Sequence, residues 1–307
     1  MTKQPPLSLL VTGSIGIDTV TSPHGKADAV LGGSAVYFSF AAAQYAPVRL
    51  VGVVGDDFPD VFRATLQSRS IDLTGLETRR GSKTFRWTGK FEGDMNEAET
   101  VDVSLNVLAE RGPAVPDAFA DSQVVFLANT HPTLQRELLS QVESPQLVVC
   151  DTMNLWIETQ RDSLIETLKV VHGVIINDAE SRLLSGKTNL IETGEWILDL
   201  GPNFVIIKKG EHGSLLVTRE GPTAVPAFPT KTVKDPTGAG DSFAGGTLGY
   251  LCEQTNTELH TLRNALVRGT VAASFTIEDF SLSKVKDLPR SEVDSRVQTF
   301  KSMLRFE

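Results

Sequence analysis

The chain has very little cysteine, with only Cys150 and Cys252 among its 307 residues. Two cysteines cannot build the disulfide framework of a small secreted fold, and the apolar neighbours of both predict buried thiols. Long hydrophobic runs are also absent, since no stretch approaches the roughly 18 apolar residues that a membrane span needs. The run 7–11 is too short for the hydrophobic region of a signal peptide and predicts a first strand instead. These absences favour a reduced, cytoplasmic protein.

Positive charge is scarce as well. Lys and Arg total 29 against 38 Asp and Glu, which gives a formal net charge of −9. An acidic chain of this kind lacks the broad electrostatic footprint that nucleic acid or an anionic membrane requires. Hydrophobic residues at 40% and charged residues at 22% are typical of a globular protein and exclude a disordered one. We therefore expect no nucleic acid and no membrane among its partners.

Apolar, β-rich runs alternate with amphipathic segments along nearly the whole chain. Continuous apolar strands separated by helices indicate a mostly parallel sheet buried on both faces, in a three-layer α/β/α sandwich. We expect one domain over 1–307. The expected strands are 7–13, 48–55, 123–129, 146–151, 173–177, 204–208 and 214–218, and the expected helices are 58–70, 133–142, 155–171, 192–200, 240–253, 259–274 and 290–304.

One region departs from this pattern. Residues 84–92 alternate apolar or aromatic residues with polar ones, which is the period of a strand with one wet face. Together with 15–21 and 101–107, this segment predicts a small antiparallel sheet that projects from the sandwich. A lid over a site, formed by about 15–30 and 82–108, and a plain surface hairpin fit the pattern equally well.

The most informative segment is 235–246, which reads Asp-Pro-Thr-Gly-Ala-Gly-Asp-Ser-Phe-Ala-Gly-Gly. Gly238 and Gly240 permit unusual backbone angles directly before an apolar helix. A glycine-rich turn at a helix N-terminus directs N–H groups and the positive end of the helix dipole toward an anion, such as a transferred phosphoryl group. Asp241 in the first turn would accept a hydroxyl proton. A capping aspartate beside packing glycines is the structural alternative, but the acid and the small residues occur together, which favours function.

This segment resembles the C-terminal signature of the ribokinase-like (PfkB) family of carbohydrate and nucleoside kinases. The resemblance implies the ribokinase-like fold, ATP and Mg²⁺ as cofactors, and a small sugar or nucleoside as substrate. It also implies that Asp241 is the catalytic base and that the amides of Gly238, Ala239 and Gly240 form an anion hole.

Two N-terminal segments follow in the order of this family. By resemblance, Asp18 after the first strand hydrogen-bonds substrate hydroxyls, although the residue alone is more typical of a turn. Gly32 and Gly33 open a helix where backbone approaches substrate closely, and tight helix packing is the alternative. Tyr37 stands where sugar-specific members carry an asparagine, so the usual sugar contact is missing. Its ring would stack against a base or close the pocket.

The nucleotide side resembles the family in two further motifs. Asn177 and Glu180 share one helical face and match an Asn-x-x-Glu motif that holds hydrated Mg²⁺ near ATP. A capping box explains the same two residues when they are taken alone, and the other motifs favour the functional role. Gly210 and Gly213 resemble the turn beside ATP, with Lys208 near the phosphates, and a plain hairpin is the alternative.

Some features have weaker implications. In certain members of the family, residues corresponding to Asp235 and Thr237 help to place a monovalent cation such as K⁺. Arg86 and Trp87 would contact substrate from a lid. Residues 151–154 follow a core strand and resemble an Asp-x-Asn segment with the Asn one position late, so we do not expect them to be catalytic.

The leading hypothesis is an ATP-dependent kinase that transfers the γ-phosphoryl group to a hydroxymethyl group of a small sugar. Tyr37 and Trp87 motivate the alternative, a nucleoside kinase (adenosine kinase-like) of the same fold, because a base needs aromatic stacking. A metabolite sensor without catalysis is more distant, since a protein of that kind has no chemical need for Asp241. The family also suggests a homodimer through the lid.

Overall fold

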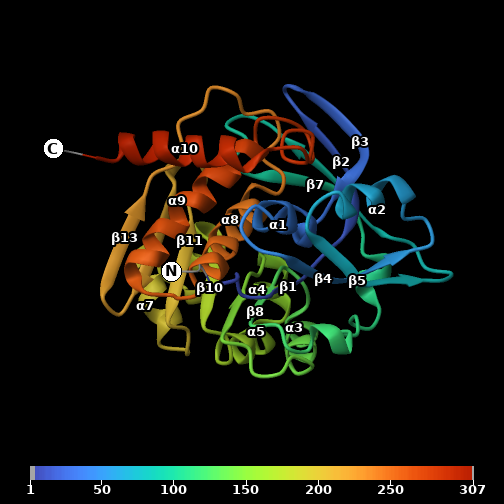
Figure 1. Cartoon of the computed structure of the whole chain (residues 1–307), viewed down its shortest axis with the longest axis horizontal. Coiled ribbons are helices and arrows are strands. Elements are labelled where there is room, and N and C mark those ends of the chain that lie inside the picture. Colours follow the sequence, from blue (N-terminus) through green and yellow to red (C-terminus); the bar gives the residue numbers. More distant parts are fainter. Residues whose placement is uncertain (1–3, 306–307) are drawn as a thin grey trace.

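The computed structural model describes residues 4–305 of the chain. Within these residues, nine strands form one sheet in the order β13-β12-β11-β10-β9-β8-β1-β4-β5. The strands from β11 to β5 run parallel, and β12 and β13 add an antiparallel edge. Figure 1 shows this sheet across the middle of the molecule with helices on both sides, which confirms the expected α/β sandwich. The strands are β1 (Leu9–Thr12), β4 (Val48–Gly55), β5 (Ile71–Arg79), β8 (Val124–Leu127), β9 (Leu147–Cys150), β10 (Gly173–Asn177), β11 (Phe204–Lys208), β12 (Ser214–Thr218) and β13 (Gly221–Val225).

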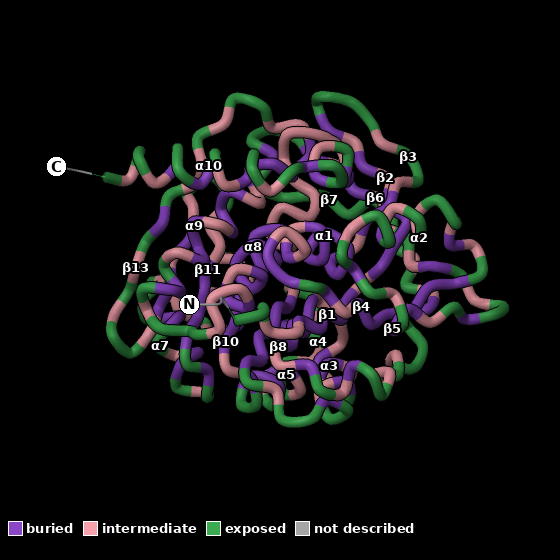
Figure 2. Tube along the Cα trace, viewed as in Figure 1, coloured by how far each residue is buried: buried purple, intermediate pink, exposed green. Residues whose placement is uncertain are grey.

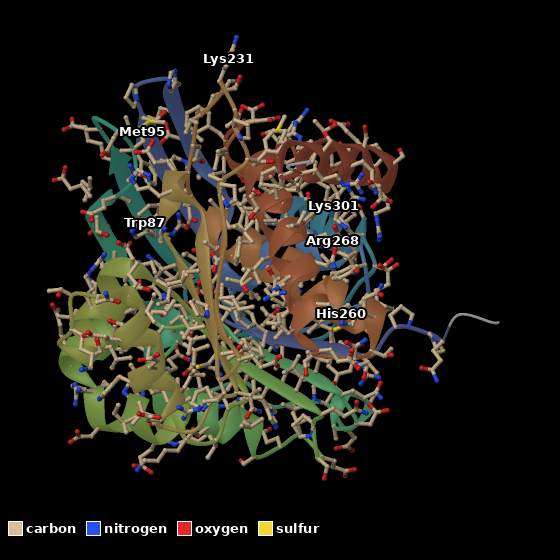
Figure 3. The ribbon with its side chains drawn as sticks, turned by 90° about the vertical axis from the view of Figure 1, so that its left-hand side faces the viewer. Trp87, Met95, Lys231, His260, Arg268 and Lys301 are labelled. Atoms are coloured by element: carbon tan, nitrogen blue, oxygen red, sulfur yellow. The ribbon has the colours of Figure 1, made fainter. Side chains whose placement is uncertain are left out.

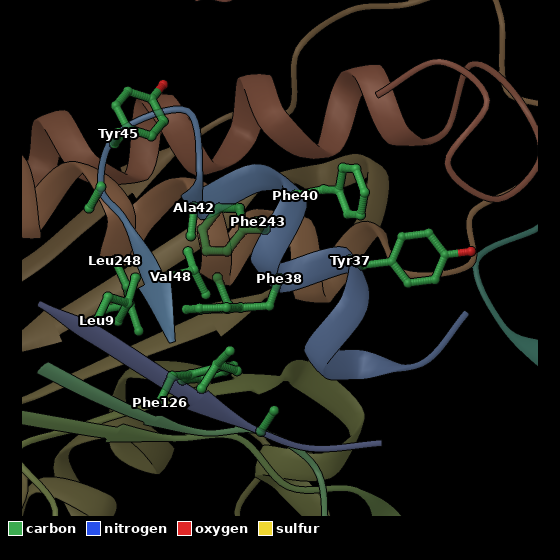
Figure 4. Close-up of a cluster of buried hydrophobic side chains, with 14 of the residues drawn as sticks. Leu9, Tyr37, Phe38, Phe40, Ala42, Tyr45, Val48, Phe126, Phe243 and Leu248 are labelled. Atoms are coloured by element: carbon green, nitrogen blue, oxygen red, sulfur yellow. The ribbon is translucent and has the colours of Figure 1, made fainter. Parts of the chain in front are cut away.

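Two hydrophobic layers cover the two faces of this sheet. Successive strand residues point to opposite faces, so Leu9 and Val11 enter one buried cluster while Leu10 enters the other. Figure 4 shows part of the first cluster, and Figure 2 shows the buried residues concentrated around the sheet. Helices α1 (Ser34–Ala42), α2 (Asp60–Gln67), α8 (Ala239–Gln254), α9 (Leu259–Thr276) and α10 (Arg290–Met303) contribute to the first cluster, and α3 (Pro132–Leu139), α4 (Asn154–Thr159), α5 (Arg161–Leu168), α6 (Asp178–Ser185) and α7 (Leu190–Leu198) contribute to the second.

The predicted elements agree with the structure best where the sequence is most apolar. Strands β4, β10, β11 and β12 have the predicted bounds. The predicted helix 155–171 is wrong as a single element, because the backbone of Gln160 leaves the helical region (φ −136°, ψ 31°) and separates α4 from α5. Strands β5 and β13 were not predicted, and both lie at the edges of the sheet, where polar residues interrupt the apolar pattern.

A second sheet projects from the first. Its strands are β2 (Gly16–Ser22), β3 (Gly25–Gly32), β6 (Phe85–Phe91) and β7 (Ala98–Ser104), in the order β3-β2-β6-β7. The outer pairs are antiparallel as predicted, but β2 runs parallel to β6, so the wholly antiparallel prediction is wrong. The intervening β4, α2 and β5 form a long crossover, which permits a parallel pair that no short hairpin could make. The strand predicted at 101–107 lies at β7 instead, because residues 106–109 form a short 3₁₀ helix.

The second sheet rests on loops near the C-terminus. The Ser22 hydroxyl donates to the carbonyl of Lys234 at 2.7 Å, and Phe91 and Met95 pack in a small apolar cluster with Phe280. Figure 3 shows Trp87 and Met95 on this sheet, on the opposite side of the molecule from α9 and α10. None of the helices in residues 4–305 has both the length and the apolar character that a membrane crossing requires.

Candidate active site

A pocket of about 600 Å³ lies where the carboxyl ends of the central strands meet the second sheet. Open α/β sheets place ligands at this edge. Most of the residues proposed from sequence meet there, whereas seven of them do not line the pocket. The lining residues are Asp18, Gly33, Tyr37, Trp87, Glu180, Lys208, Thr237, Gly238, Gly240 and Asp241, and the seven others are Gly32, Arg86, Asn177, Gly210, Gly213, Asp235 and Ala239.

The turn before α8 has the geometry of an anion site. Gly238 caps the helix in the left-handed region at φ 73°, and a Cβ there would lie only 2.2 Å from the ring of Tyr37. The Ala239 N–H donates to the Pro236 carbonyl at 3.1 Å, so this amide is already engaged. Among residues 4–305, the N–H groups of Gly238 and Gly240 have no acceptor. Two of the three proposed amides are therefore available to an anion.

Asp241 occupies the first turn of α8, beside these amides. Its side chain is partly exposed to the pocket. Burial, and after it the negative charge of Asp151, raise the pKa of Asp241 from 3.8 to about 7, although the ammonium of Lys208 opposes both effects. A carboxylate that titrates near neutral pH is suited to accept a hydroxyl proton.

Lys208 stands beside the same turn. It ends β11, its Nζ lies 3.2 Å from Oδ2 of Asp151, and a Cβ at Gly240 would lie 3.1 Å from that Nζ. Burial alone would lower the pKa of Lys208, but the carboxylates of Asp151, Glu180 and Asp241 raise it above its usual value. Lys208 is therefore a charged ammonium next to the free amides of the turn.

Asp151 is a residue that sequence reasoning set aside. It follows β9 and is only 5% exposed, and its Oδ1 accepts the Thr152 N–H at 2.8 Å. Its ion pair with Lys208 crosses the carboxyl end of β10, because β10 lies between β9 and β11. The available signal was its position directly after a parallel core strand. We call Asp151, Glu180, Lys208 and Asp241 the charged end of the pocket.

Asn177 and Glu180 form a complete capping box at the start of α6. Oδ1 of Asn177 accepts the Glu180 N–H at 2.7 Å, and Oε2 of Glu180 accepts the Asn177 N–H at 3.0 Å. Burial raises the pKa of Glu180 to about 7, with a further contribution from Asp151. Among residues 4–305, no three His, Cys, Asp or Glu side chains converge on a metal position. The Glu180 carboxylate lines the pocket, and an oxygen ligand of this kind is one that Mg²⁺ takes together with water and phosphate oxygens.

Asp18 provides a polar contact under the second sheet. It is 3% exposed, and its Oδ1 has no hydrogen-bond partner within residues 4–305. Burial is the main cause that raises the pKa of Asp18 to about 7, and the negative charge of Asp235 is the next largest cause. A Cβ at Gly32 would lie 1.9 Å from Oδ2 of Asp18, so only glycine fits there. A buried, unpaired carboxyl oxygen beside a pocket is a ready partner for a substrate hydroxyl.

The ring of Tyr37 is buried against the turn before α8. It is 1% exposed and its ring packs on Gly238. Figure 4 shows its hydroxyl directed away from Phe38 and Phe126. Of the two roles expected for Tyr37, its burial fits closure of the pocket better than stacking on a base.

Arg86, Gly210 and Gly213 make local contacts outside the pocket lining, and their expected roles toward substrate and ATP stay predictions. Arg86 pairs with Asp57 at 2.8 Å outside the pocket. Gly210 (φ 53°) meets the loop between β6 and β7, where a Cβ would lie 2.8 Å from Oδ1 of Asn96, and Gly213 (φ 83°) packs against the end of β13.

At the proposed site for a monovalent cation, the carboxylate of Asp235 accepts hydrogen bonds from the backbone. Both oxygens of Asp235 accept backbone N–H groups, from Thr237 at 2.9 Å and from Ser281 at 3.3 Å. Cation binding at Asp235 and Thr237 stays a prediction.

Aromatic and apolar side chains also line the pocket, and we call this set the aromatic end: Phe85, Trp87, Val103, Leu105, His131 and Trp156. The rings of His131 and Trp156 meet edge to face with centroids 5.2 Å apart. Val103 is 49% exposed and Leu105 39% exposed, which is unusual for large apolar side chains beside a cavity. Sequence reasoning identified only Trp87 in this group. His131 and Trp156 follow β8 and β9, and that position was the available signal.

Comparisons with known proteins agree with this geometry. The profile of the pfkB family of carbohydrate kinases matches residues 29–287. The chain is 31% identical over 255 residues to a cytidine kinase of Thermococcus kodakarensis, which covers 80% of this chain and 88% of that protein. It is 24% identical over 316 residues to a 5-dehydro-2-deoxygluconokinase of Photobacterium profundum, covering 94% and 93% of the two chains.

The fold matches a solved structure as well. A nucleoside kinase of Burkholderia thailandensis in complex with inosine superposes with a TM-score of 0.78 at 19% identity, over 95% of this chain and 97% of that one. The family match, the fold and the assembled turn at α8 lead to one conclusion. The chain belongs to the pfkB family of carbohydrate kinases, and it is a phosphotransferase with an alcohol group as acceptor, in a family that uses ATP.

Proposed function

We propose that this kinase phosphorylates the primary hydroxyl of a nucleoside. The observation that carries the proposal is the aromatic end of the pocket, where Trp87, Val103, Leu105 and Trp156 present ring and apolar surface. A free sugar is bound chiefly through hydrogen bonds to its hydroxyls, whereas a nucleobase is bound by stacking on aromatic faces. The 31% identical cytidine kinase supports the same substrate class.

The two ends of the pocket suggest how the substrate lies. The ribose hydroxyls would bind the free Oδ1 of Asp18, and the base would occupy the aromatic end. The primary hydroxyl would then face Asp241. Asp241 takes the hydroxyl proton as the oxygen forms a bond to the γ-phosphorus of ATP and the bond from that phosphorus to the β-bridging oxygen breaks. ADP leaves with the electron pair of the broken bond.

The chain supplies positive potential where charge develops. The free N–H groups of Gly238 and Gly240 and the ammonium of Lys208 surround the position of the transferred phosphoryl group. Hydrogen-bond donors fixed before the reaction stabilise such charge without reorganisation. Glu180 would hold hydrated Mg²⁺ near the ATP phosphates, and the ion would neutralise charge on the phosphate oxygens.

A sugar kinase, the leading hypothesis from sequence, is the second candidate. Asp18 favours it, because an unpaired carboxyl oxygen binds the hydroxyls of a free sugar as well as those of ribose. The 5-dehydro-2-deoxygluconokinase relative supports it too. Burial of the ring of Tyr37, which replaces the usual asparagine, argues against it.

The test measures ADP release from ATP and Mg²⁺ with cytidine, uridine, inosine, adenosine, ribose and a panel of hexoses as acceptors. Mass spectrometry of the products identifies the phosphorylated compound. Turnover with at least one nucleoside at a kcat/KM well above that for ribose supports the proposal. Turnover with free sugars alone would contradict it and would favour the second candidate.

Three other expectations stay predictions: activation by K⁺, a homodimer through the second sheet, and a cytoplasmic location. Activity in K⁺ against Na⁺ buffers, sedimentation analysis and cell fractionation test them in turn.

A further inference from the structure

Asn129 holds a hydrogen-bond donor in the aromatic end of the pocket. Its Oδ1 accepts the indole N–H of Trp156 at 2.9 Å. An indole nitrogen can only donate, so the amide oxygen must face Trp156 and the amide nitrogen must face the other way. One N–H of that nitrogen contacts the sulfur of Met153 at 3.1 Å. The second N–H has no acceptor among residues 4–305, and Asn129 lines the pocket.

The hydrogen bonds of His131 also determine which of its ring nitrogens is a donor. Its Nδ1 accepts the backbone N–H of Thr133 at 3.1 Å and thereby caps α3. A backbone nitrogen can only donate, so Nδ1 is unprotonated and the neutral ring carries its proton on Nε2. No acceptor for that N–H exists within residues 4–305. His131 therefore offers a second donor, two positions from Asn129 and against the same indole ring.

These two donors can distinguish bases of the same shape. Cytosine presents neighbouring acceptors at O2 and N3, whereas uracil presents a donor at N3. A 6-oxopurine presents acceptors at O6 and N7, whereas adenine places a donor amino group beside N7. We propose that Asn129 and His131 select nucleosides whose base presents two neighbouring acceptors, with Trp156 as the positioning residue that orients the Asn129 amide. This inference rests on the proposed nucleoside kinase activity.

The aromatic surroundings strengthen the selection. A donor in a largely apolar pocket loses its water when a base enters, and a base that offers another donor leaves both groups unsatisfied. The ring of Trp156 lies beside Asn129 and His131, and it offers a stacking surface that any base can use. Stacking would thus bind any base, and the hydrogen-bond donors would choose among them.

The experiment compares kcat/KM for two pairs of equal size, cytidine with uridine and inosine with adenosine. We expect the wild type to prefer cytidine and inosine, each by about tenfold or more. Asn129→Asp replaces the donor with a carboxylate of the same shape that still accepts the Trp156 N–H. We expect this variant to abolish or reverse the preference for cytidine over uridine, measured as the ratio of the two kcat/KM values.

Two further variants separate selection from folding. Trp156→Phe keeps a ring but frees the amide of Asn129 to rotate, so the ratio of kcat/KM for cytidine to that for uridine should fall toward unity. His131→Asp retains an oxygen that can cap α3 but has no N–H to donate, so it should weaken the same preference. Asn203→Asp is the matched control, because Asn203 is exposed and outside the pocket. Its preference should equal that of the wild type.

The outcomes distinguish this inference from the proposed function. If the wild type phosphorylates no nucleoside, the proposed function fails and the selection fails with it. If the wild type phosphorylates nucleosides but treats each pair alike, or if Asn129→Asp keeps the full preference, only the selection is overturned.

Discussion

The charged end and the aromatic end of the pocket differ in the elements that supply their residues. The charged end gathers Asp151, Glu180, Lys208 and Asp241 from the termini of core strands and helices. The aromatic end takes Trp87, Val103 and Leu105 from the second sheet and from the residues directly after it, and it takes His131 and Trp156 from segments that follow β8 and β9. The core is buried on both faces, whereas β7 is exposed along most of its length. The core thus holds all of the charged end and part of the aromatic end, and the more exposed second sheet adds apolar surface that recognises shape.

This difference predicts that the transfer step and the choice of acceptor can be changed separately. Substitutions at the charged end should act on kcat or on ATP. Substitutions at the aromatic end should act on the KM of the acceptor.

The largest effect should come from Asp241→Asn. Loss of the general base acts on the transition state, so we expect kcat to fall by roughly 10²–10⁴-fold with little change in nucleotide affinity. Steady-state kinetics and titration with an ATP analogue measure the two quantities. Asp199→Asn, at an exposed ion pair with Arg219, is the control. A kcat within tenfold of the wild-type value would rule out Asp241 as the base.

Lys208→Met should come next. The change removes the ammonium beside the turn and leaves Asp151 and Asp241 without its charge. We expect the KM for ATP to rise by about 10–100-fold, since a desolvated charged hydrogen bond is worth about 1.5–3 kcal/mol. Lys187→Met, in the loop between α6 and α7 and outside the pocket lining, is the control. An unchanged KM for ATP together with a raised KM for the nucleoside would break the division between the two ends.

A smaller effect concerns stability against pH. The pKa of Asp241 is about 7 in the folded protein against 3.8 for the free side chain, so folding favours its protonated form. Its contribution to stability is full below about pH 4 and is lost as the pH rises to about 7. Asparagine cannot ionise. The free energy of unfolding of Asp241→Asn should therefore be about 1–2 kcal/mol higher than that of the wild type at pH 8. Partial contact of the side chain with solvent keeps this difference below what the full pKa shift would give.

Urea denaturation of both proteins at pH 4.5 and pH 8 checks this prediction. The gain should be smaller at pH 4.5, where the wild-type carboxyl is protonated when folded. An equal gain at both values would show that ionisation of Asp241 is not its cause.

The smallest effect should come from Trp87→Leu in the second sheet. The indole N–H donates to the hydroxyl of Thr100 at 3.1 Å, and its ring lines the pocket. Loss of an aromatic contact costs about 0.5–1.5 kcal/mol, so the KM for the nucleoside should rise by about twofold to tenfold at constant kcat. Trp87→Phe should recover most of this loss. A drop in kcat with an unchanged KM would contradict the proposed role.

The sequence predicted the charged end better than the aromatic end. Strands such as β10 and β11 were predicted with correct bounds because their residues form unbroken apolar runs. The turn at Gly238 was found because the glycines and Asp241 are contiguous, so one segment holds the whole local geometry. Lys208 was located through the strand that it ends.

Other features had no local signal. Asn177 and Glu180 satisfy a capping box and a ligand motif with the same spacing, so only coordinates reveal that the box is formed. His131 and Trp156 meet across β8 and β9, 25 residues apart in the chain, and neither carries a distinctive motif. The parallel pairing of β2 with β6 depends on a crossover through β4, α2 and β5, which alternation along one strand cannot reveal.

The most direct measurement is the ratio of kcat/KM for cytidine to that for uridine, determined in the wild type and in Asp241→Asn. If the two ends act separately, both rates should fall by the same large factor in Asp241→Asn and the ratio should stay within about twofold of the wild-type value. A ratio that collapses when only the base at the charged end is changed would contradict the division between transfer and choice of acceptor.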